Sequence, residues 1–276
     1  MTGWDSLARE LACWHDAGKV ATVWWRDDDA VASTDALERL LILSQKHAAG
    51  LGLAVIPERC DAALAERLSD AARGTHARIA VLQHGIAHEN TAPAGEKKTE
   101  LSQAAPLNET MERLKAGQDR LAGLFGQGFL PVLVPPWNRI SPEIIAELPA
   151  RGVSGLSTYK ARPQRMAAPG LLQVNTHADL LRWKPDRGFL GETEVLGLLQ
   201  THLQDRREDR ADADEPTGIL THHLVHDEAT WVFLDRLLGW LKRQPAIKFL
   251  APSEAFSHSA LTNQNEKHSA AGKGPM

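Results

Sequence analysis

Residues 20–30 read VATVWWRDDDA, an apolar run that ends in a basic residue and three aspartates. The run over 20–25 is β-branched and aromatic, which predicts a buried strand. Similar short apolar runs recur along the chain, separated by segments whose apolar residues have helical spacing. Strand followed by helix, repeated in this way, indicates an α/β fold with a mainly parallel sheet. We expect further strands at 51–56, 78–83, 129–134, 153–157, 171–176, 218–223 and 246–251.

Capping residues mark where several helices begin. Ser33 or Thr34 opens one helix, Asn108 a second, Ser141 with a following proline a third, and Asp227 a fourth. Other helices are expected at roughly 4–17, 59–73 and 192–204, and the aperiodic segment 90–106 is expected to be a long loop.

Length and composition bound the class of protein. A chain of 276 residues suits one α/β domain, which we expect over 1–256, with a disordered polar tail over 257–276. The net charge of -4 argues against a nucleic-acid partner, and two cysteines cannot build a disulfide framework. No apolar run reaches the ~18 residues of a membrane span, and the first residues lack a signal-peptide pattern. We therefore expect a cytoplasmic protein with no membrane partner.

Polar clusters follow the predicted strands, at the sheet edge where parallel α/β folds place their functional residues. The three aspartates at 27–29 repel one another, so a bound cation or Arg26 should offset the repulsion. His84 and His88 are four residues apart, and on a helical turn both imidazoles can bind one metal. The other clusters are PPWNR (135–139), NTHAD (175–179) with Trp183, and THHLVHD (221–227). Taken singly, each cluster also has a purely structural interpretation.

The cluster at 221–227 holds three histidines within five residues. Side chains alternate along a strand, so one or two of the three can face a common site and at least one is structural. One carboxylate with two histidines is a common hydrolytic metal site that leaves positions open for water. A second carboxylate can then act as a base and a further histidine as an acid. The sequence supplies all of these groups at successive strand ends.

The order of the clusters resembles that of the polysaccharide deacetylase family, the NodB-homology domain of carbohydrate esterase family 4. That family shows Asp-Asp-Gly, His-x-x-x-His, Arg-x-Pro-Tyr/Phe, an Asp/Trp motif and Leu-x-His, and the resemblance spans roughly residues 20–255. It implies a distorted (β/α) barrel of about seven or eight mainly parallel strands. It also implies a metal-dependent hydrolase that removes acetyl groups from an N- or O-acetylated carbohydrate, so that 1–256 is a single catalytic domain.

By this resemblance, Asp28 is the catalytic base, and Asp29 binds the metal with His84 and His88. Asp27 and Asp28 are the other choice of base and ligand, because the three-aspartate run leaves the register open. His222 completes Leu-x-His and is the expected acid, with His223 as the fallback. The implied substrate pocket is formed by Trp137, Asn138, Asp179, Trp183, Leu220 and His223, and the backbone N–H of Trp137 is a candidate oxyanion donor.

One position departs from the family pattern. Val134 stands where the family has the arginine that orients the base. Arg139, five residues on, is expected to take that role, and Arg26 is the alternative. The implied cofactor is a divalent metal: Zn²⁺ suits two imidazoles and a carboxylate, and Co²⁺ or Ni²⁺ binds similarly.

Two further functions stay open on the sequence. One is a cytosolic amidohydrolase acting on a small cyclic amide or ureide, which a lid formed by 90–106 would favour. The other is a non-catalytic carbohydrate-binding relative that has lost the base-orienting arginine. Expected partners are therefore an acetylated sugar or a small amide, and no oligomeric state is predicted.

Overall fold

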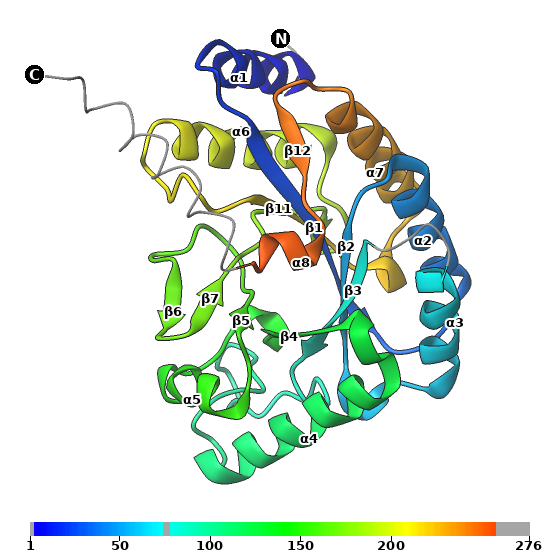
Figure 1. The fold of residues 1–276 in the computed structure, drawn as a ribbon, viewed down its shortest axis with the longest axis vertical. Coiled ribbons are helices and arrows are strands. Elements are labelled where there is room, and N and C mark those ends of the chain that lie inside the picture. The colour runs from blue at the N-terminus through cyan, green and yellow to red at the C-terminus, as the bar shows by residue number, and fades with distance from the viewer. Residues whose placement is uncertain (1–2, 74–77, 258–276) are drawn as a thin grey trace, which may run out of the picture.

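The computed structural model describes residues 3–73 and 78–257 of the chain. Within these residues a ten-stranded sheet runs in the order β6-β7-β5-β4-β3-β2-β1-β11-β8, with β12 also paired to β1. Its neighbouring strands are parallel except for β6 and β7. This confirms the predicted α/β fold with a mainly parallel sheet (Figure 1). The strands are β1 (Ala21–Ala30), β2 (Leu51–Val55), β3 (Ile79–His84), β4 (Phe129–Val134), β5 (Gly155–Leu156), β6 (Met166–Ala168), β7 (Leu171–Gln173), β8 (Ala178–Asp179), β11 (Thr217–Thr221) and β12 (Ile247–Phe249), with a separate antiparallel pair of β9 (Leu181–Arg182) and β10 (Gly188–Phe189).

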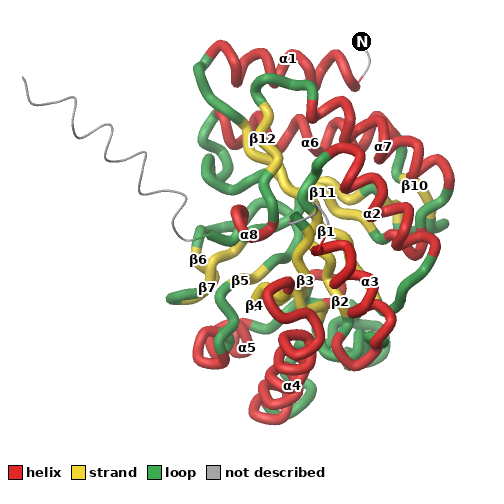
Figure 2. The backbone as a smooth tube through the Cα atoms, turned by 45° about the vertical axis from the view of Figure 1, so that its right-hand side comes forward, coloured by secondary structure: helices red, strands yellow, loops and turns green. Residues whose placement is uncertain are grey.

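Helices surround the sheet. Figure 2 shows α2 and α7 together on one flank, and α1 beside α6 at one end of the molecule. The α-helices are α1 (Gly3–Asp16), α2 (Asp35–His47), α3 (Ala62–Arg73), α4 (Leu107–Phe125), α5 (Pro142–Glu147), α6 (Glu192–Arg207), α7 (Glu228–Lys242) and α8 (Pro252–Ala255). Short 3₁₀ turns are η1 (Pro57–Arg59), η2 (Gly126–Gly128), η3 (Pro136–Asn138), η4 (Pro149–Arg151) and η5 (His223–Val225).

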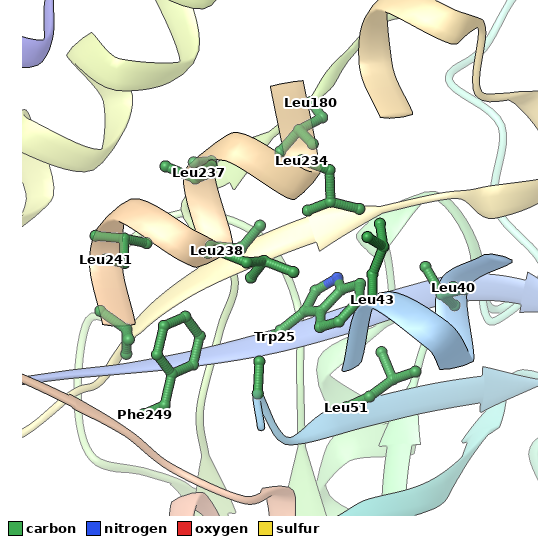
Figure 3. Packing of buried hydrophobic residues seen from close by; sticks show 14 of the residues in the cluster. Trp25, Leu40, Leu43, Leu51, Leu180, Leu234, Leu237, Leu238, Leu241 and Phe249 are labelled. Atoms are coloured by element: carbon green, nitrogen blue, oxygen red, sulfur yellow. The ribbon is translucent and has the colours of Figure 1, made fainter. Parts of the chain in front are cut away.

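The largest hydrophobic core lies between the sheet and helices α2 and α7. Trp25 of β1 is fully buried there among leucines of both helices, including Leu40 and Leu238 (Figure 3). Burying a side chain of this size contributes about 1.5–3 kcal/mol. The indole N–H of Trp25 donates to Thr221 Oγ1 at 2.8 Å, so no polar atom of the ring is left unpaired. This core fixes β1 against β11, and the two strands carry the polar clusters.

Strand β1 continues through the aspartates instead of ending before them. It pairs with β11 as far as Asp27, and its pairing with β2 shifts register between Asp27 and Ala30. Asp29 within this shift has φ of 73°, in the left-handed region. Regular alternation would put Asp27 and Asp29 on one face. The bulge turns Asp29 away from Asp27 and toward the side on which Asp28 lies.

Several predicted boundaries hold and others differ. Thr34, Ser141 and Asp227 cap α2, α5 and α7 through their side chains, as predicted. Helix α4 is capped by Pro106 and not by Asn108. The short strands β6, β8, β9 and β10 have too few residues for a periodic signal. The predicted tail, apart from Ser257, lies outside the described residues.

Across residues 3–73 and 78–257, none of the helices has the length and apolar character that crossing a bilayer requires.

Candidate metal centre and active site

Asp29, His84 and His88 bring three ligand atoms together at the carboxyl ends of β1 and β3. The Nε2 atoms of His84 and His88 lie 3.1 and 3.3 Å from Asp29 Oδ1. One ligand atom from each residue lies within 4.8 Å of the other two. The predicted metal ligands are therefore neighbours in space, with Asp29 and not Asp28 as their carboxylate.

The hydrogen bonds of His84 prepare it to bind a cation. Its Nδ1–H donates to the Val134 carbonyl oxygen at 2.9 Å, so a neutral ring presents the Nε2 lone pair toward Asp29. A lone pair facing a carboxylate is unfavourable unless a proton or a metal ion lies between the two atoms, and in the absence of metal a proton on Nε2 forms a hydrogen bond to Asp29. Burial lowers the pKa of His84, but the Asp29 carboxylate outweighs it and the net pKa is raised. Burial raises the pKa of Asp29, but the hydrogen bond from His84 outweighs that and holds it well below the usual range. Two imidazoles and one carboxylate thus fit a divalent metal such as Zn²⁺.

His88 lies on a loop and not on the helical turn that the sequence predicted. Gly85 and His88 both have φ of 58°, which a helix does not allow. A Cβ atom at Gly85 would lie 2.5 Å from Pro136 Cδ, so only glycine fits this turn. Burial, and the proximity of His84, lower the pKa of His88, which favours the neutral ring that a metal binds.

Glu100, which was not among the residues predicted from the sequence, holds the loop that carries His88. Its carboxylate is 7% exposed and accepts hydrogen bonds from the backbone N–H groups of Ile86, Ala87 and Glu89, at 2.9, 2.8 and 3.1 Å. The residue belongs to the segment predicted as a long loop. Its only sequence signal is an acidic residue in a polar stretch, which is too common to single out.

Asp28 is held by Arg26, not by Arg139. The guanidinium of Arg26 is fully buried and donates from Nη2 to Asp28 Oδ2 at 2.9 Å, while its Nε lies 2.8 Å from Oδ1 in an ion-pair contact without hydrogen-bond geometry. Its remaining N–H groups donate to Asn138 Oδ1, Ser157 Oγ and the carbonyl oxygen of residue 158. Arg139 instead donates to the Lys98 carbonyl oxygen at 2.8 Å. The expectation that Arg139 orients Asp28 therefore does not match the geometry, whereas the alternative, Arg26, does.

His222 lies beside Asp28 and Asp179. Its Nε2 is 4.0 Å from Asp28 Oδ2, and its Nδ1 is 3.9 Å from Asp179 Oδ1. Trp183 packs edge-on against the His222 ring and donates its indole N–H to Asp179 Oδ2 at 2.8 Å. Burial raises the pKa of Asp179. Trp183 is 42% exposed, so it lines the rim of the site.

The other predicted pocket residues have different surroundings. The Trp137 ring lies 4.4 Å from the His88 ring and has φ of 54°. Asn138 contacts Arg26, as described above. Leu220 is 1% exposed and pairs in register with Asp179 across β11 and β8. Leu220 also pairs in register with Arg26, and register-paired side chains share a face, so Leu220 lies on the Asp28 side of the sheet. His223 is also 1% exposed and binds Asp27 through Nδ1 at 2.5 Å, so it does not reach that side.

A second trio, of His177, His202 and Glu215, lies buried away from this site. His177 Nδ1 accepts the N–H of Gly218 at 2.9 Å, so the neutral ring carries its proton on Nε2 and offers no lone pair there. The rings of His177 and His202 are stacked with an interplanar angle of 14°, and in-plane lone pairs of nearly parallel rings do not converge on one point. Burial lowers the pKa of both histidines. The two histidines are therefore neutral, and the trio does not present converging lone pairs to a metal.

Known protein structures are similar to this chain in fold, at sequence identities too low to show its activity. No protein-family model and no curated protein matches the sequence. A protein from Mycobacterium smegmatis assigned to the polysaccharide deacetylases is similar in structure, with a TM-score of 0.57, 15% identity, and coverage of 87% of this chain and 90% of that one. A family 4 acetyl xylan esterase from Clostridium thermocellum in complex with cobalt has a TM-score of 0.50, 15% identity, and coverage of 85% and 90%.

A third similar structure is a mutant of a CE4 family pseudoenzyme with restored enzymatic activity, with a TM-score of 0.53, 18% identity, and coverage of 87% of this chain and 68% of that one. Because similar structures include both enzymes and a pseudoenzyme, the fold alone does not decide activity. The resemblance predicted from the sequence is confirmed at the level of the fold: the chain has the NodB-like α/β fold of the family 4 polysaccharide deacetylases.

Proposed function

We propose that this protein is a metal-dependent hydrolase that removes acetyl groups from an N- or O-acetylated carbohydrate. The observation that carries the proposal is the buried ion pair of Arg26 and Asp28, in which Asp28 precedes the metal-ligand candidate Asp29 in the chain and lies 4.0 Å from His222 Nε2. Without an arginine on Asp28, a binding protein that had lost its base-orienting group would be the better interpretation. The pair therefore favours an enzyme. We propose a single catalytic domain over 1–256, acting in the cytoplasm.

Each group has a distinct task in the proposed reaction. A divalent metal, when bound by Asp29, His84 and His88, supplies Lewis-acid polarisation of the acyl group and of water. Asp28 takes the proton of the attacking water, while the Arg26 guanidinium fixes the direction of its carboxylate. His222 gives a proton to the leaving amine or alcohol.

The three candidate ligands exclude some divalent metals but do not identify a single one. Two imidazole nitrogens with one carboxylate suit Zn²⁺, Co²⁺ and Ni²⁺, and disfavour Mg²⁺ and Ca²⁺, which prefer oxygen ligands. We propose Zn²⁺ as the physiological metal because it binds such sites tightly without redox chemistry.

The test combines metal analysis with acetate release. Purified protein should contain one equivalent of metal and release acetate from acetylated oligosaccharides. His84→Ala and His88→Ala should lose both the metal and the activity, and Asp28→Asn should lose the activity and keep the metal. Hydrolysis of equal rate after complete metal removal would contradict the proposal. Screening small cyclic amides alongside the sugars separates this function from that of an amidohydrolase.

A further inference from the structure

Asp27 and His223 form a buried pair that the proposed reaction does not use. Asp27 is fully buried at the end of β1 and directs its side chain away from Asp28. Its Oδ2 accepts the Thr221 hydroxyl at 2.6 Å and the backbone N–H of His223 at 3.0 Å. Its Oδ1 accepts the ring Nδ1–H of His223 at 2.5 Å. One carboxylate therefore ties the end of β1 to the end of β11 through three hydrogen bonds.

The geometry of the pair indicates a strong link. Asp27 and His223 are both buried, and the ring Nδ1 lies 2.5 Å from Asp27 Oδ1, which is short for a hydrogen bond. Loss of the ring donor would leave a buried carboxylate oxygen without a partner, so the contact holds the two residues together.

The ring of His222, the neighbour of His223, is held by packing and not by side-chain hydrogen bonds. Trp183 packs edge-on against it. Among the residues that the structure describes, none accepts or donates a hydrogen bond at His222 Nδ1, and Nε2 is 4.0 Å from Asp28, beyond hydrogen-bond distance. Apart from Trp183, the placement of the ring therefore depends on the backbone of residues 222 and 223. That backbone is fixed by the N–H of His223 on Asp27 and by the N–H of His222 on His226 Nε2 at 3.3 Å.

We infer that Asp27 and His223 are a positioning pair, which sets the place of the acid His222 relative to the base Asp28. The inference rests on the proposed function for the roles of those two groups. Asp27 precedes Asp28 in the chain and His223 follows His222, so each member of the pair is joined by one peptide bond to a member of the reacting pair. The ring of His223 is 1% exposed, which excludes direct contact with a substrate.

Two amide variants of His223 test whether its role requires a hydrogen-bond donor at the position of Nδ1 or only a polar side chain. In His223→Asn the amide nitrogen lies close to the place of Nδ1 and can donate to Asp27; in His223→Gln it lies one bond further out. We expect His223→Asn to keep nearly the wild-type kcat. His223→Gln should lower kcat by about 10- to 100-fold, with KM and bound metal unchanged. If His223→Gln does not fold, Thr221→Val, which removes the hydroxyl donor to Asp27, replaces it with the same expected split.

A spectroscopic readout tests the pair independently of activity. In protein labelled with ¹⁵N-histidine, the ring signal of His222 is identified by its loss in His222→Gln. That signal should shift in His223→Gln and stay in place in His223→Asn. If wild type releases no acetate while these shifts occur, the proposed function fails and the positioning role stands. Equal kcat values and an unmoved His222 signal in both variants would overturn the positioning role.

Discussion

Arg26 contacts Asp28, and Val134 stands where the family pattern has the arginine that would make this contact. It lies two residues before Asp28 on β1, so the two side chains share a face, and the planar guanidinium can bind both carboxylate oxygens. The sequence alone left Arg26 and Arg139 open, because distance along the chain does not reveal which side chain turns inward. Alternation on a strand would have favoured Arg26, had the strand been predicted to continue beyond Trp25.

Arg26→Lys should therefore lower kcat strongly. A lysine keeps the positive charge but cannot contact both carboxylate oxygens while also donating to Asn138 and Ser157, and we expect a loss of about 100-fold. Arg139→Lys is the matched control and should retain activity, because Arg139 contacts the Lys98 carbonyl oxygen instead of Asp28. Steady-state kinetics of the two variants decide the point, and a larger loss in Arg139→Lys would contradict the assignment.

His226 predicts a pH dependence of stability. Burial lowers its pKa from 6.5 to about 4, and in the folded protein its neutral Nε2 accepts the N–H of His222. As the pH falls from 6.5 toward 4, the unfolded chain takes up a proton before the folded protein does, so the free energy of unfolding decreases. His226→Gln can accept the same hydrogen bond without titrating, and its stability should fall less over this range. Urea unfolding at several pH values measures the difference, and parallel curves for the two proteins would refute it.

At the scale of elements, the end of β3 and the loop that follows it carry two of the three candidate metal ligands, His84 and His88. Glu100 holds this loop in place. The sequence located His84 and His88 correctly but predicted a helical turn, because their spacing fits a helix as well as it fits this loop. The loop that carries His88 is held by the Glu100 carboxylate, which lies eleven or more positions along the chain from the N–H groups that donate to it. Interactions at that separation leave no periodic pattern in a sequence, so Glu100 could not be predicted.

Glu100→Gln should weaken metal binding. An amide replaces one carboxylate oxygen, so at least one of the three N–H groups loses its acceptor and the loop loosens around His88. We expect the Kd for Zn²⁺ to rise by about 10- to 100-fold. Glu96→Gln, an exposed position in the same loop, is the control and should bind metal as wild type does. Competition with a chelating dye gives both constants.

The strands that could be predicted are those with several consecutive apolar residues. β1, β2, β3, β4 and β11 each begin within one residue of the predicted position, because buried parallel strands require such runs. The bulge at Asp29 could not be predicted, since aspartate has no strong preference for φ of 73°. That bulge decides which of the three aspartates faces the histidines, and for this reason the choice between Asp28 and Asp29 required a structure.

At the scale of the whole molecule, the two histidine clusters should respond differently to metal. Only the trio of Asp29, His84 and His88 presents convergent lone pairs, so we expect one Zn²⁺ per chain and not two. Binding should stabilise the folded protein by about 2.7 kcal/mol when free metal is at about 100 times Kd. The rise in Tm should disappear in His88→Ala and persist in His202→Asn. A second equivalent of metal that His202→Asn abolishes would show that the buried trio binds as well.

The left-handed backbone at Asp29 also affects how this protein could lose its chemistry in evolution. Asparagine tolerates that conformation as well as aspartate does, whereas most other side chains would strain it. A single base change converts an aspartate codon to an asparagine codon. Asp29→Asn would then remove the charge of the metal-binding carboxylate and keep the bulge, the sheet and the substrate rim. Under the proposed function, a descendant that binds the substrate without cleaving it would be one mutation away, and it would inherit an intact fold.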